Sequence, residues 1–176
     1  MTIEQLKDQL PDYAKDIRLN LGSVISPEGA PDLTLNQLYG VALASAYATR
    51  NAAVIEAVKG TVADSLSAAE QEAAKSAAAI MGMNNIYYRF VHLSGDAEYK
   101  TMPAKLRMNV IGAPGIPKLD FELYCLAVSA INGCGMCIEA HNHEVLKAGL
   151  SKLGVQSAVR IAAVVNAAAQ GLAIAA

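Results

Sequence analysis

Apolar residues recur along most of the chain with the spacing of amphipathic helices. In the segment LTLNQLYGVALASA, for example, Leu35, Leu38, Ala42 and Ala46 follow one another at intervals of three or four residues, which gathers them on one face of a helix. No stretch of five or more residues alternates between apolar and polar with the period of two that is typical of a half-buried strand. The pattern therefore predicts an all-α protein.

Caps and breakers mark where several of these helices begin and end. Ser67 is followed three residues later by Glu70, a capping box whose hydroxyl and carboxylate satisfy free N–H groups of a first helical turn. The strongest interruption is GAPGIPK, residues 112–118, whose prolines cannot continue a preceding helix. Pro117 is well suited to open the next helix, FELYCLAVSAIN, and Gly133 is a natural left-handed terminator for it.

The chain contains a weak internal repeat. A shift of 85 positions lays residues 38–46 over 123–131 and residues 71–80 over 156–165. Because the same shift serves both pairs of segments, we predict a duplicated helical unit, of which the second half, about residues 115–176, carries the candidate chemistry. In the first half, the positions that correspond to the cysteines and histidine discussed below are Thr49, Ala52 and Glu56.

Length and composition narrow the possible classes of protein. A chain of 176 residues suits one domain, residues 1–176, with a sizeable core. Hydrophobic residues make up 53% of it, much of that alanine, which favours closely packed helices because alanine combines the best helix propensity with a small side chain. There are 14 basic and 16 acidic residues, and no two Lys or Arg are adjacent. A nucleic-acid or anionic-membrane partner would normally leave a basic patch, so we expect neither.

Two segments bear on where the protein resides. Residues 1–20 are charged and amphipathic without an apolar stretch, so we expect no secretory signal. Residues 161–176 carry no charge, but they are short for a membrane span and are interrupted by Asn166 and Gln170, so a buried or subunit-facing helix is the better interpretation. Three cysteines without an export signal indicate a reducing compartment, and we expect a cytoplasmic protein in which a CxxC motif is catalytic or binds metal.

The candidate chemistry lies in INGCGMCIEAHNHEVLKAG, residues 131–149. If a helix starts at Cys134, a rotation of about 100° per residue places Cys137 about 60° and His141 about 20° away from it, so the three side chains share one face. His143 falls on the opposite side and is interpreted as a surface histidine.

The two cysteines of the motif differ in their surroundings. On a first helical turn they can form a disulfide, and the free N–H groups there stabilise a thiolate, which favours Cys134 as the nucleophile. His141 favours Cys137, because it is one turn from that residue but two turns, an axial rise of about 10 Å, from Cys134. We therefore assign Cys137 as the nucleophilic thiolate, Cys134 as its resolving partner and His141 as the base.

Glu122 lies 12 residues before Cys134, on the preceding predicted helix. A carboxylate there can orient and charge His141, in a nucleophile–base–orienter arrangement, if the two helices fold back on one another. The alternative is an exposed glutamate in a first helical turn, where the helix dipole stabilises it. Spacing by itself favours this alternative.

Other readings of the same residues stay open at this point. Cys134, Cys137 and His141 form an incomplete tetrahedral zinc site to which Glu122 would have to supply the fourth ligand. A helical interaction scaffold that keeps the fold without dithiol chemistry is a third class. No glycine-rich phosphate loop is present, so we expect no flavin or nicotinamide cofactor.

The remaining sulfur-containing and histidine residues have simpler interpretations. Cys125 falls in mid-helix among Leu and Val, as a small buried hydrophobe does. His92 has no cysteine or acidic partner nearby in sequence, so we interpret it as a packed or surface histidine. Four methionines are interpreted as core filler: Met81, Met83, Met102 and Met108.

The segment MNVIGAPGIPKLDFELYCLAVSAINGCGMCIEAHNHEVLKAG closely resembles the motif region of the alkyl hydroperoxidase D (AhpD) family, within the carboxymuconolactone decarboxylase-like superfamily. AAAIMGMNNIYYRF and LPDYAKDIRLNL resemble the family too, so the resemblance spans nearly the whole chain. The family pattern is a Glu, eleven residues, CxxC, three residues and a His. It is matched here by Glu122, Cys134, Cys137 and His141.

The resemblance implies an antioxidant alkyl hydroperoxide reductase with an all-α, AhpD-like fold that is typically a homotrimer. Such a protein reduces organic hydroperoxides through a dithiol–disulfide cycle and regenerates the peroxiredoxin AhpC. Its electrons come from dihydrolipoamide carried on a lipoyl-bearing acyltransferase. It binds no cofactor or metal of its own.

The resemblance also implies roles for the matched residues. Cys137 is the peroxidatic cysteine and passes through a sulfenic acid. Cys134 serves as proton donor and resolves that intermediate to a Cys134–Cys137 disulfide; as the accessible sulfur, it is expected to form the mixed disulfide with AhpC. His141 is the base, and Glu122 orients and charges it. Some family members have a histidine just before the second cysteine, where this chain has Met136, so any proton relay by that histidine is lost or replaced here.

Overall fold

The computed structural model describes residues 1–175, which form helices joined by loops and no strand. The elements are α1 (Ile3–Lys7), the 3₁₀ turn η1 (Asp12–Ala14), α2 (Lys15–Val24), α3 (Leu35–Thr49), α4 (Ala52–Val62), α5 (Ala68–Leu93), α6 (Glu98–Thr101), α7 (Asn109–Gly112), α8 (Lys118–Asn132), α9 (Gly135–Lys147) and α10 (Lys152–Ala175). The prediction of an all-α protein is confirmed.

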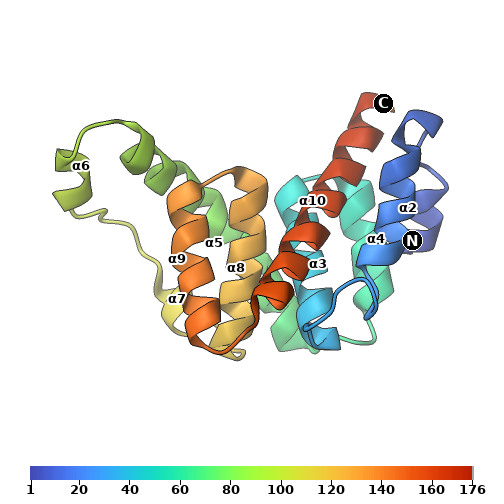
Figure 1. Ribbon diagram of the computed structural model, residues 1–176, viewed down its shortest axis with the longest axis horizontal. Coiled ribbons are helices and arrows are strands. Elements are labelled where there is room, and N and C mark those ends of the chain that lie inside the picture. The colour runs from blue at the N-terminus through green and yellow to red at the C-terminus, as the bar shows by residue number, and fades with distance from the viewer. Residues whose placement is uncertain (176) are drawn as a thin grey trace.

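Four long helices make up the centre of the protein. α3 and α8 pack against each other and both contact α5 and α10, while α9 covers α8 and α5 at one end (Figure 1). At the other end, α1, α2 and α4 pack together and α2 contacts α10 (Figure 1). The C-terminal part of α5 and the short α6 extend away from this body as an arm (Figure 1). The CxxC motif therefore lies where α8, α9 and α5 meet.

Small residues let the central helices approach one another closely. Gly40 of α3 lies against the fully buried Tyr124 of α8, and a Cβ atom at Gly40 would overlap the Tyr124 hydroxyl and ring. Even alanine does not fit there without displacing an aromatic ring. Burial raises the pKa of the Tyr124 phenol, and its hydroxyl has no hydrogen-bond partner among the described residues.

The local start and stop signals act as the sequence predicts. Ser67 is the N-cap of α5, where its hydroxyl accepts a hydrogen bond from the Glu70 backbone N–H and the Glu70 carboxylate accepts one from the Ser67 backbone N–H. Pro117 directly precedes α8, and Gly133 ends it in the left-handed conformation with φ of 69°. Glycine adopts that conformation without the steric cost that a Cβ atom imposes.

The order of helices in the two halves of the chain agrees with the shift of 85 positions seen in the sequence. α3, α4 and α5 in the first half correspond in order to α8, α9 and α10 in the second. α3 and α8 each end in a left-handed residue, Arg50 with φ of 60° and Gly133 with φ of 69°. These correspondences are consistent with a duplicated unit, and the duplication itself stays a prediction.

The apolar C-terminal tract lies in α10. By length and composition alone this helix is apolar enough to cross a membrane, yet it contacts α2, α3 and α8 and buries a stripe that includes Ala158, Ile161 and Val165. Burial against other helices therefore accounts for part of its hydropathy, as expected for a buried or subunit-facing helix. The last residue of the predicted tract, Ala176, lies outside the described residues.

Candidate redox site

The turn between α8 and α9 presents the two cysteines. After Gly133, the backbone N–H of Cys134 returns to the Ser129 carbonyl at 3.2 Å, which closes the end of α8 in the manner of a Schellman motif. Cys134 is then the N-cap of α9, and its Sγ accepts a hydrogen bond from the Cys137 backbone N–H at 3.3 Å. The two sulfurs form a disulfide, with 5.3 Å between the Cα atoms. The spacing of the motif thus brings the two cysteines together as the helical geometry predicts.

A chain of polar contacts from α5 fastens this turn. The Arg89 guanidinium donates to the Asn132 carbonyl at 2.6 Å, and the Asn132 amide donates to the Asn85 side-chain oxygen at 2.9 Å. The Asn85 amide in turn donates to the Ser129 hydroxyl at 2.9 Å. These contacts hold the end of α8 in a defined orientation, so that the first turn of α9, with both cysteines, is positioned by three helices.

The two sulfurs differ in their access to solvent. Cys134 is completely buried, whereas Cys137 is 6% exposed. Cys137 also lines a cavity of about 220 Å³, and Cys134 does not. The expectation that Cys134 is the accessible sulfur is therefore wrong, because its side chain is enclosed by the protein on all sides. This removes the reason for expecting an external thiol to attack Cys134.

The cavity beside Cys137 is mostly apolar. α5 contributes Met81, Asn84 and Tyr88 to its wall, α9 contributes Met136, Cys137, Ala140 and His141, and the segment before α8 contributes Met108 and Ile111. The structure thus brings Cys137 and His141 to one cavity, as their shared helical face predicts. A larger cavity of about 430 Å³, which Asn85 and Arg89 help to line, contains neither of these residues.

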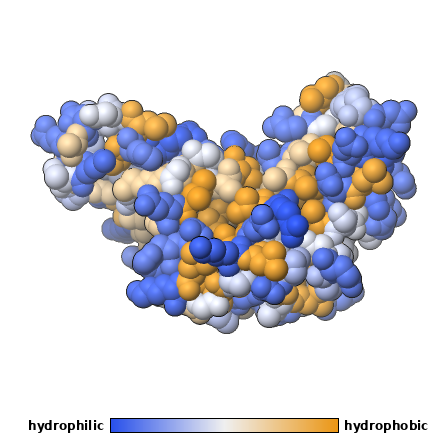
Figure 2. Space-filling model, in the orientation of Figure 1, coloured by the Kyte–Doolittle hydropathy of each residue, from blue (hydrophilic) through white to orange (hydrophobic). Residues whose placement is uncertain are grey.

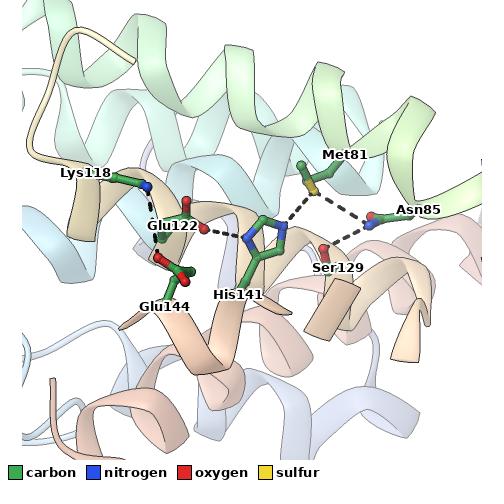
Figure 3. A network of polar contacts seen from close by, with 7 residues as sticks. All are labelled: Met81, Asn85, Lys118, Glu122, Ser129, His141 and Glu144. Atoms are coloured by element: carbon green, nitrogen blue, oxygen red, sulfur yellow. Dashed lines mark hydrogen bonds and ion pairs between the residues drawn. The ribbon is translucent and has the colours of Figure 1, made fainter. Parts of the chain in front are cut away.

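Glu122 and His141 form a buried pair. The Glu122 Oε2 atom lies 2.6 Å from Nδ1 of His141, and the two residues are 5% and 8% exposed (Figure 3). The alternative of an exposed first-turn glutamate is therefore wrong, because the packing of α9 on α8 brings the carboxylate onto the imidazole. A carboxylate that accepts the proton on Nδ1 fixes the ring tautomer and leaves Nε2 as the basic nitrogen.

Met81 occupies the other side of the imidazole. Its Sδ atom lies 3.2 Å from Nε2 of His141 and 3.7 Å from the Asn85 amide nitrogen (Figure 3). A thioether has no proton to donate and is itself only a weak acceptor, so it leaves the basic Nε2 free to exchange protons with a stronger partner in the cavity. Met81 is fully buried, as predicted for core filler, but nothing in the sequence predicts its contact with the base.

The other methionines depart from the prediction of core filler. Met83 is half-buried, and Met108 is half-buried and lines the cavity. Met102 is 48% exposed on the arm, so its assignment to the core is wrong. The missed residues of the site share one signal in the sequence. Positions 81, 84, 85 and 88 recur with the spacing of one helical face, and two of them are asparagines.

The remaining cysteine and histidines behave largely as predicted. Cys125 is fully buried, and burial raises the pKa of its thiol, which keeps it protonated and unreactive. His143 and His92 are both exposed. The ring of His92 nevertheless lies beside the CxxC motif, because a Cβ atom at Gly135 would be 3.6 Å from its Cε1 atom. No three His, Cys, Asp or Glu side chains within residues 1–175 are arranged to hold a metal ion.

Comparison with known proteins relates this geometry to a family. Residues 97–176 match the model of the carboxymuconolactone decarboxylase family. The chain is 59% identical to alkyl hydroperoxide reductase AhpD of Rhodospirillum centenum over 169 residues. This match covers 96% of this chain and 89% of the relative. The chain belongs to the AhpD family. The AhpD proteins of Methylocella silvestris and Coxiella burnetii are each 56% identical to it, and it covers 95% of either relative.

Membership in the AhpD family confirms the resemblance seen in the sequence. The matches extend over nearly the whole chain, and therefore over the segments that carry the disulfide, the Glu122–His141 pair and the α5 residues of the cavity. An AhpD-family protein with such a dithiol site is an oxidoreductase.

Proposed function

We propose that the protein is an antioxidant hydroperoxide reductase that cycles Cys134 and Cys137 between dithiol and disulfide. The observation that carries this proposal is the convergence on one cavity of Cys137, which is bonded to Cys134, and His141, which is paired with Glu122. The names of the relatives, all alkyl hydroperoxide reductases, support the same substrate class.

In the first step of the proposed cycle, the reduced Cys137 thiol loses its proton to Nε2 of His141. The Glu122 carboxylate, 2.6 Å from Nδ1, stabilises the positive charge that then forms on the ring. The Cys137 thiolate attacks the terminal oxygen of the hydroperoxide, so that an S–O bond forms and the O–O bond breaks. The products are a Cys137 sulfenic acid and an alkoxide, and the alkoxide takes the proton from His141 and leaves as an alcohol.

In the second step, the Cys134 sulfur attacks the Cys137 sulfenic acid. The Cys134–Cys137 disulfide forms, and the hydroxyl group leaves as water with the proton that the Cys134 thiol supplies. Cys134 suits this role because it is buried against Cys137 and cannot be reached by another molecule. Because Cys134 already lies beside Cys137, it can resolve the sulfenic acid within one molecule, ahead of thiols that must first enter the cavity.

An external dithiol completes the cycle, and we propose protein-bound dihydrolipoamide for this role. Its thiolate attacks Cys137, the more exposed sulfur, and Cys134 leaves as a thiolate. The hydrogen bond from the Cys137 backbone N–H to the Cys134 sulfur, at 3.3 Å, stabilises that leaving group, as does the positive end of the α9 dipole. The second thiol of the reductant then releases Cys137. With the disulfide of AhpC as acceptor, Cys137 is likewise the sulfur that forms the mixed disulfide.

The cavity wall indicates which hydroperoxides fit. Thioether and aliphatic side chains dominate it, among them Met108, Ile111 and Met136. An alkyl group gains free energy by leaving water for such a surface, whereas hydrogen peroxide has no apolar part to bury. The site therefore favours organic hydroperoxides with a compact apolar group.

We further propose that the protein assembles as a homo-oligomer, most simply the trimer. The arm carries a stripe of exposed apolar side chains at helical spacing: Ile86 is 65%, Phe90 51% and Leu93 72% exposed. Apolar surface is visible on this arm in Figure 2. Exposure of such a stripe to water is unfavourable, so it marks a site of contact with another molecule. Most soluble oligomers are homo-oligomers, so we propose a second copy of the chain as that partner.

The dithiol cycle is tested by peroxide consumption and intact mass on one sample. Reduced wild-type protein is expected to lose two hydrogens on reaction with one equivalent of cumene hydroperoxide. Cys137→Ser is expected to consume none, and Cys134→Ser to retain a sulfenic acid that dimedone traps on Cys137. Cys125→Ala, a substitution at the remaining buried cysteine, serves as the matched control and should behave as wild type. Stoichiometric zinc in the purified protein, or a dimedone label on Cys134 in the Cys137→Ser variant, would overturn the proposal.

A further inference from the structure

The side chain of Asn84 is buried without a hydrogen-bond partner. It is only 4% exposed, and its Oδ1 atom has no partner among the described residues. Its neighbour in the chain shows the usual state of a buried amide, because Asn85 donates to Ser129 and accepts from Asn132, both at 2.9 Å. Buried amide groups almost always have such partners. The side-chain oxygen of Asn84 therefore contributes no hydrogen bond that would hold the fold together.

Asn84 lies in the wall of the cavity that Cys137 and His141 line. Its backbone carbonyl oxygen is 3.9 Å from the Cys137 Sγ atom, so the residue adjoins the reacting sulfur. The Tyr88 hydroxyl in the same wall contacts the Met108 sulfur at 3.9 Å, and most of the remaining wall is apolar. An unpaired amide at this place is poised to bind a small polar group that enters beside the sulfur.

We infer that Asn84 binds the hydroperoxide group of the substrate through both ends of its amide. This inference rests on the proposed peroxidase function and adds a catalytic residue to it. The terminal O–H of the hydroperoxide donates to Oδ1, and the amide nitrogen donates to the oxygen that carries the alkyl group. A hydroperoxide offers a donor and an acceptor on adjacent atoms, which matches the acceptor and the donor of one amide.

This arrangement assists the step in which the O–O bond breaks. As the Cys137 thiolate attacks the terminal oxygen, negative charge develops on the oxygen that carries the alkyl group, until it takes the proton from His141. A hydrogen bond from the Asn84 amide is strongest at that moment, because it points at the developing charge inside an apolar cavity. The two contacts also keep the terminal oxygen facing the sulfur, with the alkyl group against the methionines of the opposite wall.

The test compares Asn84→Leu with Asn85→Leu in the full-length protein. Leucine has a similar size but no hydrogen-bonding group. In Asn84→Leu, the second-order rate of oxidation of the reduced protein by cumene hydroperoxide is expected to fall by about 10²-fold or more, the usual effect of one lost donor to a developing anion. The melting temperature should be unchanged or higher. Asn85→Leu should instead lower the melting temperature, because it leaves Ser129 and Asn132 without partners.

Two further measurements distinguish peroxide binding by Asn84 from a role in forming the Cys137 thiolate or in reducing the disulfide. The rate and pH profile of Cys137 alkylation by iodoacetamide, which needs the thiolate but no bound peroxide, should be the same in Asn84→Leu and wild type. Reduction of the Cys134–Cys137 disulfide by dihydrolipoamide should also be unchanged. If the leucine variant does not fold, Asn84→Ala replaces it.

A wild-type rate of oxidation in the folded variant would overturn the inference. So would a parallel loss of alkylation, because Asn84 would then act on the thiolate and not on the peroxide. If wild-type protein itself fails to react with cumene hydroperoxide while its disulfide is still reduced by dihydrolipoamide, the proposed peroxidase function fails, and the inference fails with it for that separate reason.

Discussion

The Glu122 carboxylate lies 2.6 Å from the His141 imidazole although 19 residues separate them in the chain. Both side chains are buried, so water does not screen the charge of one from the other. In the first half of the chain, the shift of 85 positions places Gln37 opposite Glu122. Gln37 completes the cap of α3 and donates to Asp120 at 2.8 Å. Of the two corresponding residues, Gln37 and Glu122, the charged one therefore lies in the half of the chain that also carries His141.

Glu122→Gln is expected to retain the fold and lose activity. The amide oxygen can still accept the Nδ1–H bond, but the negative charge that stabilises protonated His141 is gone. Turnover of cumene hydroperoxide should fall by roughly 10²-fold, the lower end of what a positioned acid–base group supplies. Glu144→Gln, which removes a charge 4.0 Å from Lys118 on the same helix pair (Figure 3), should leave turnover nearly unchanged. Near-normal turnover in a folded Glu122→Gln protein would remove Glu122 from the mechanism.

Gly40→Ala is expected to destabilise the protein. The new Cβ atom meets the ring of Tyr124, and overpacking of this kind costs about 1–3 kcal/mol. Gly82 offers the matched control, because it lies inside α5 and has no atom within 4 Å of a Cβ built on it. Gly82→Ala should stabilise by up to about 1 kcal/mol through helix propensity. Urea unfolding of the two variants measures both changes, and equal effects would mean that α3 and α8 do not pack this closely.

Cys125 is expected to be unreactive in the folded protein. With the disulfide intact it is the one remaining thiol, so DTNB at pH 8 should label no sulfur in native protein and one after unfolding in guanidinium chloride. Rapid labelling of native protein would show that the α8 thiol is reached by solvent.

The same thiol predicts a pH dependence of stability. Burial raises the folded-state pKa of Cys125, so its contribution is fully present below the unfolded-state value of about 8.5 and is lost as the pH rises above it. The free energy of unfolding of wild type relative to Cys125→Ala should therefore fall above that pH, by up to about 1.4 kcal/mol per pH unit. Groups that ionise in both proteins, such as Tyr124, contribute equally to the two free energies of unfolding and cancel in their difference. A difference that stays constant between pH 7 and 10 would contradict the burial of the thiol.

Phe90→Asp is expected to dissociate the proposed oligomer. The substitution places a charge in the middle of the apolar stripe on α5, which a contact between copies would have to bury without a partner. Leu19→Asp is the matched control, because Leu19 is also strongly exposed, at 62%, but lies on α2 away from the arm. Sedimentation velocity at micromolar concentration should show trimers for wild type and Leu19→Asp and smaller species for Phe90→Asp. Monomeric wild-type protein would refute the oligomer.

The features that the sequence by itself determined are those that depend on neighbours within one or two helical turns. The cap at Ser67, the left-handed end at Gly133 and the shared face of Cys134, Cys137 and His141 follow from hydrogen bonds and rotations over a few residues. These local features do not depend on how the rest of the chain folds. The family pattern can likewise be recognised from the sequence alone, because it is defined by the spacing of its glutamate, cysteines and histidine along the chain.

Only the tertiary structure decided which side chains from different helices meet. Glu122 reaches His141 because α9 folds back on α8, and Met81 and Asn84 reach the cavity because α5 crosses both. The burial of Cys134 and the opening of Cys137 to the cavity likewise depend on how the helices pack around the motif. Such contacts follow from the packing of whole helices, to which many residues each contribute a little. No short stretch of sequence states which polar group will be enclosed beside which sulfur.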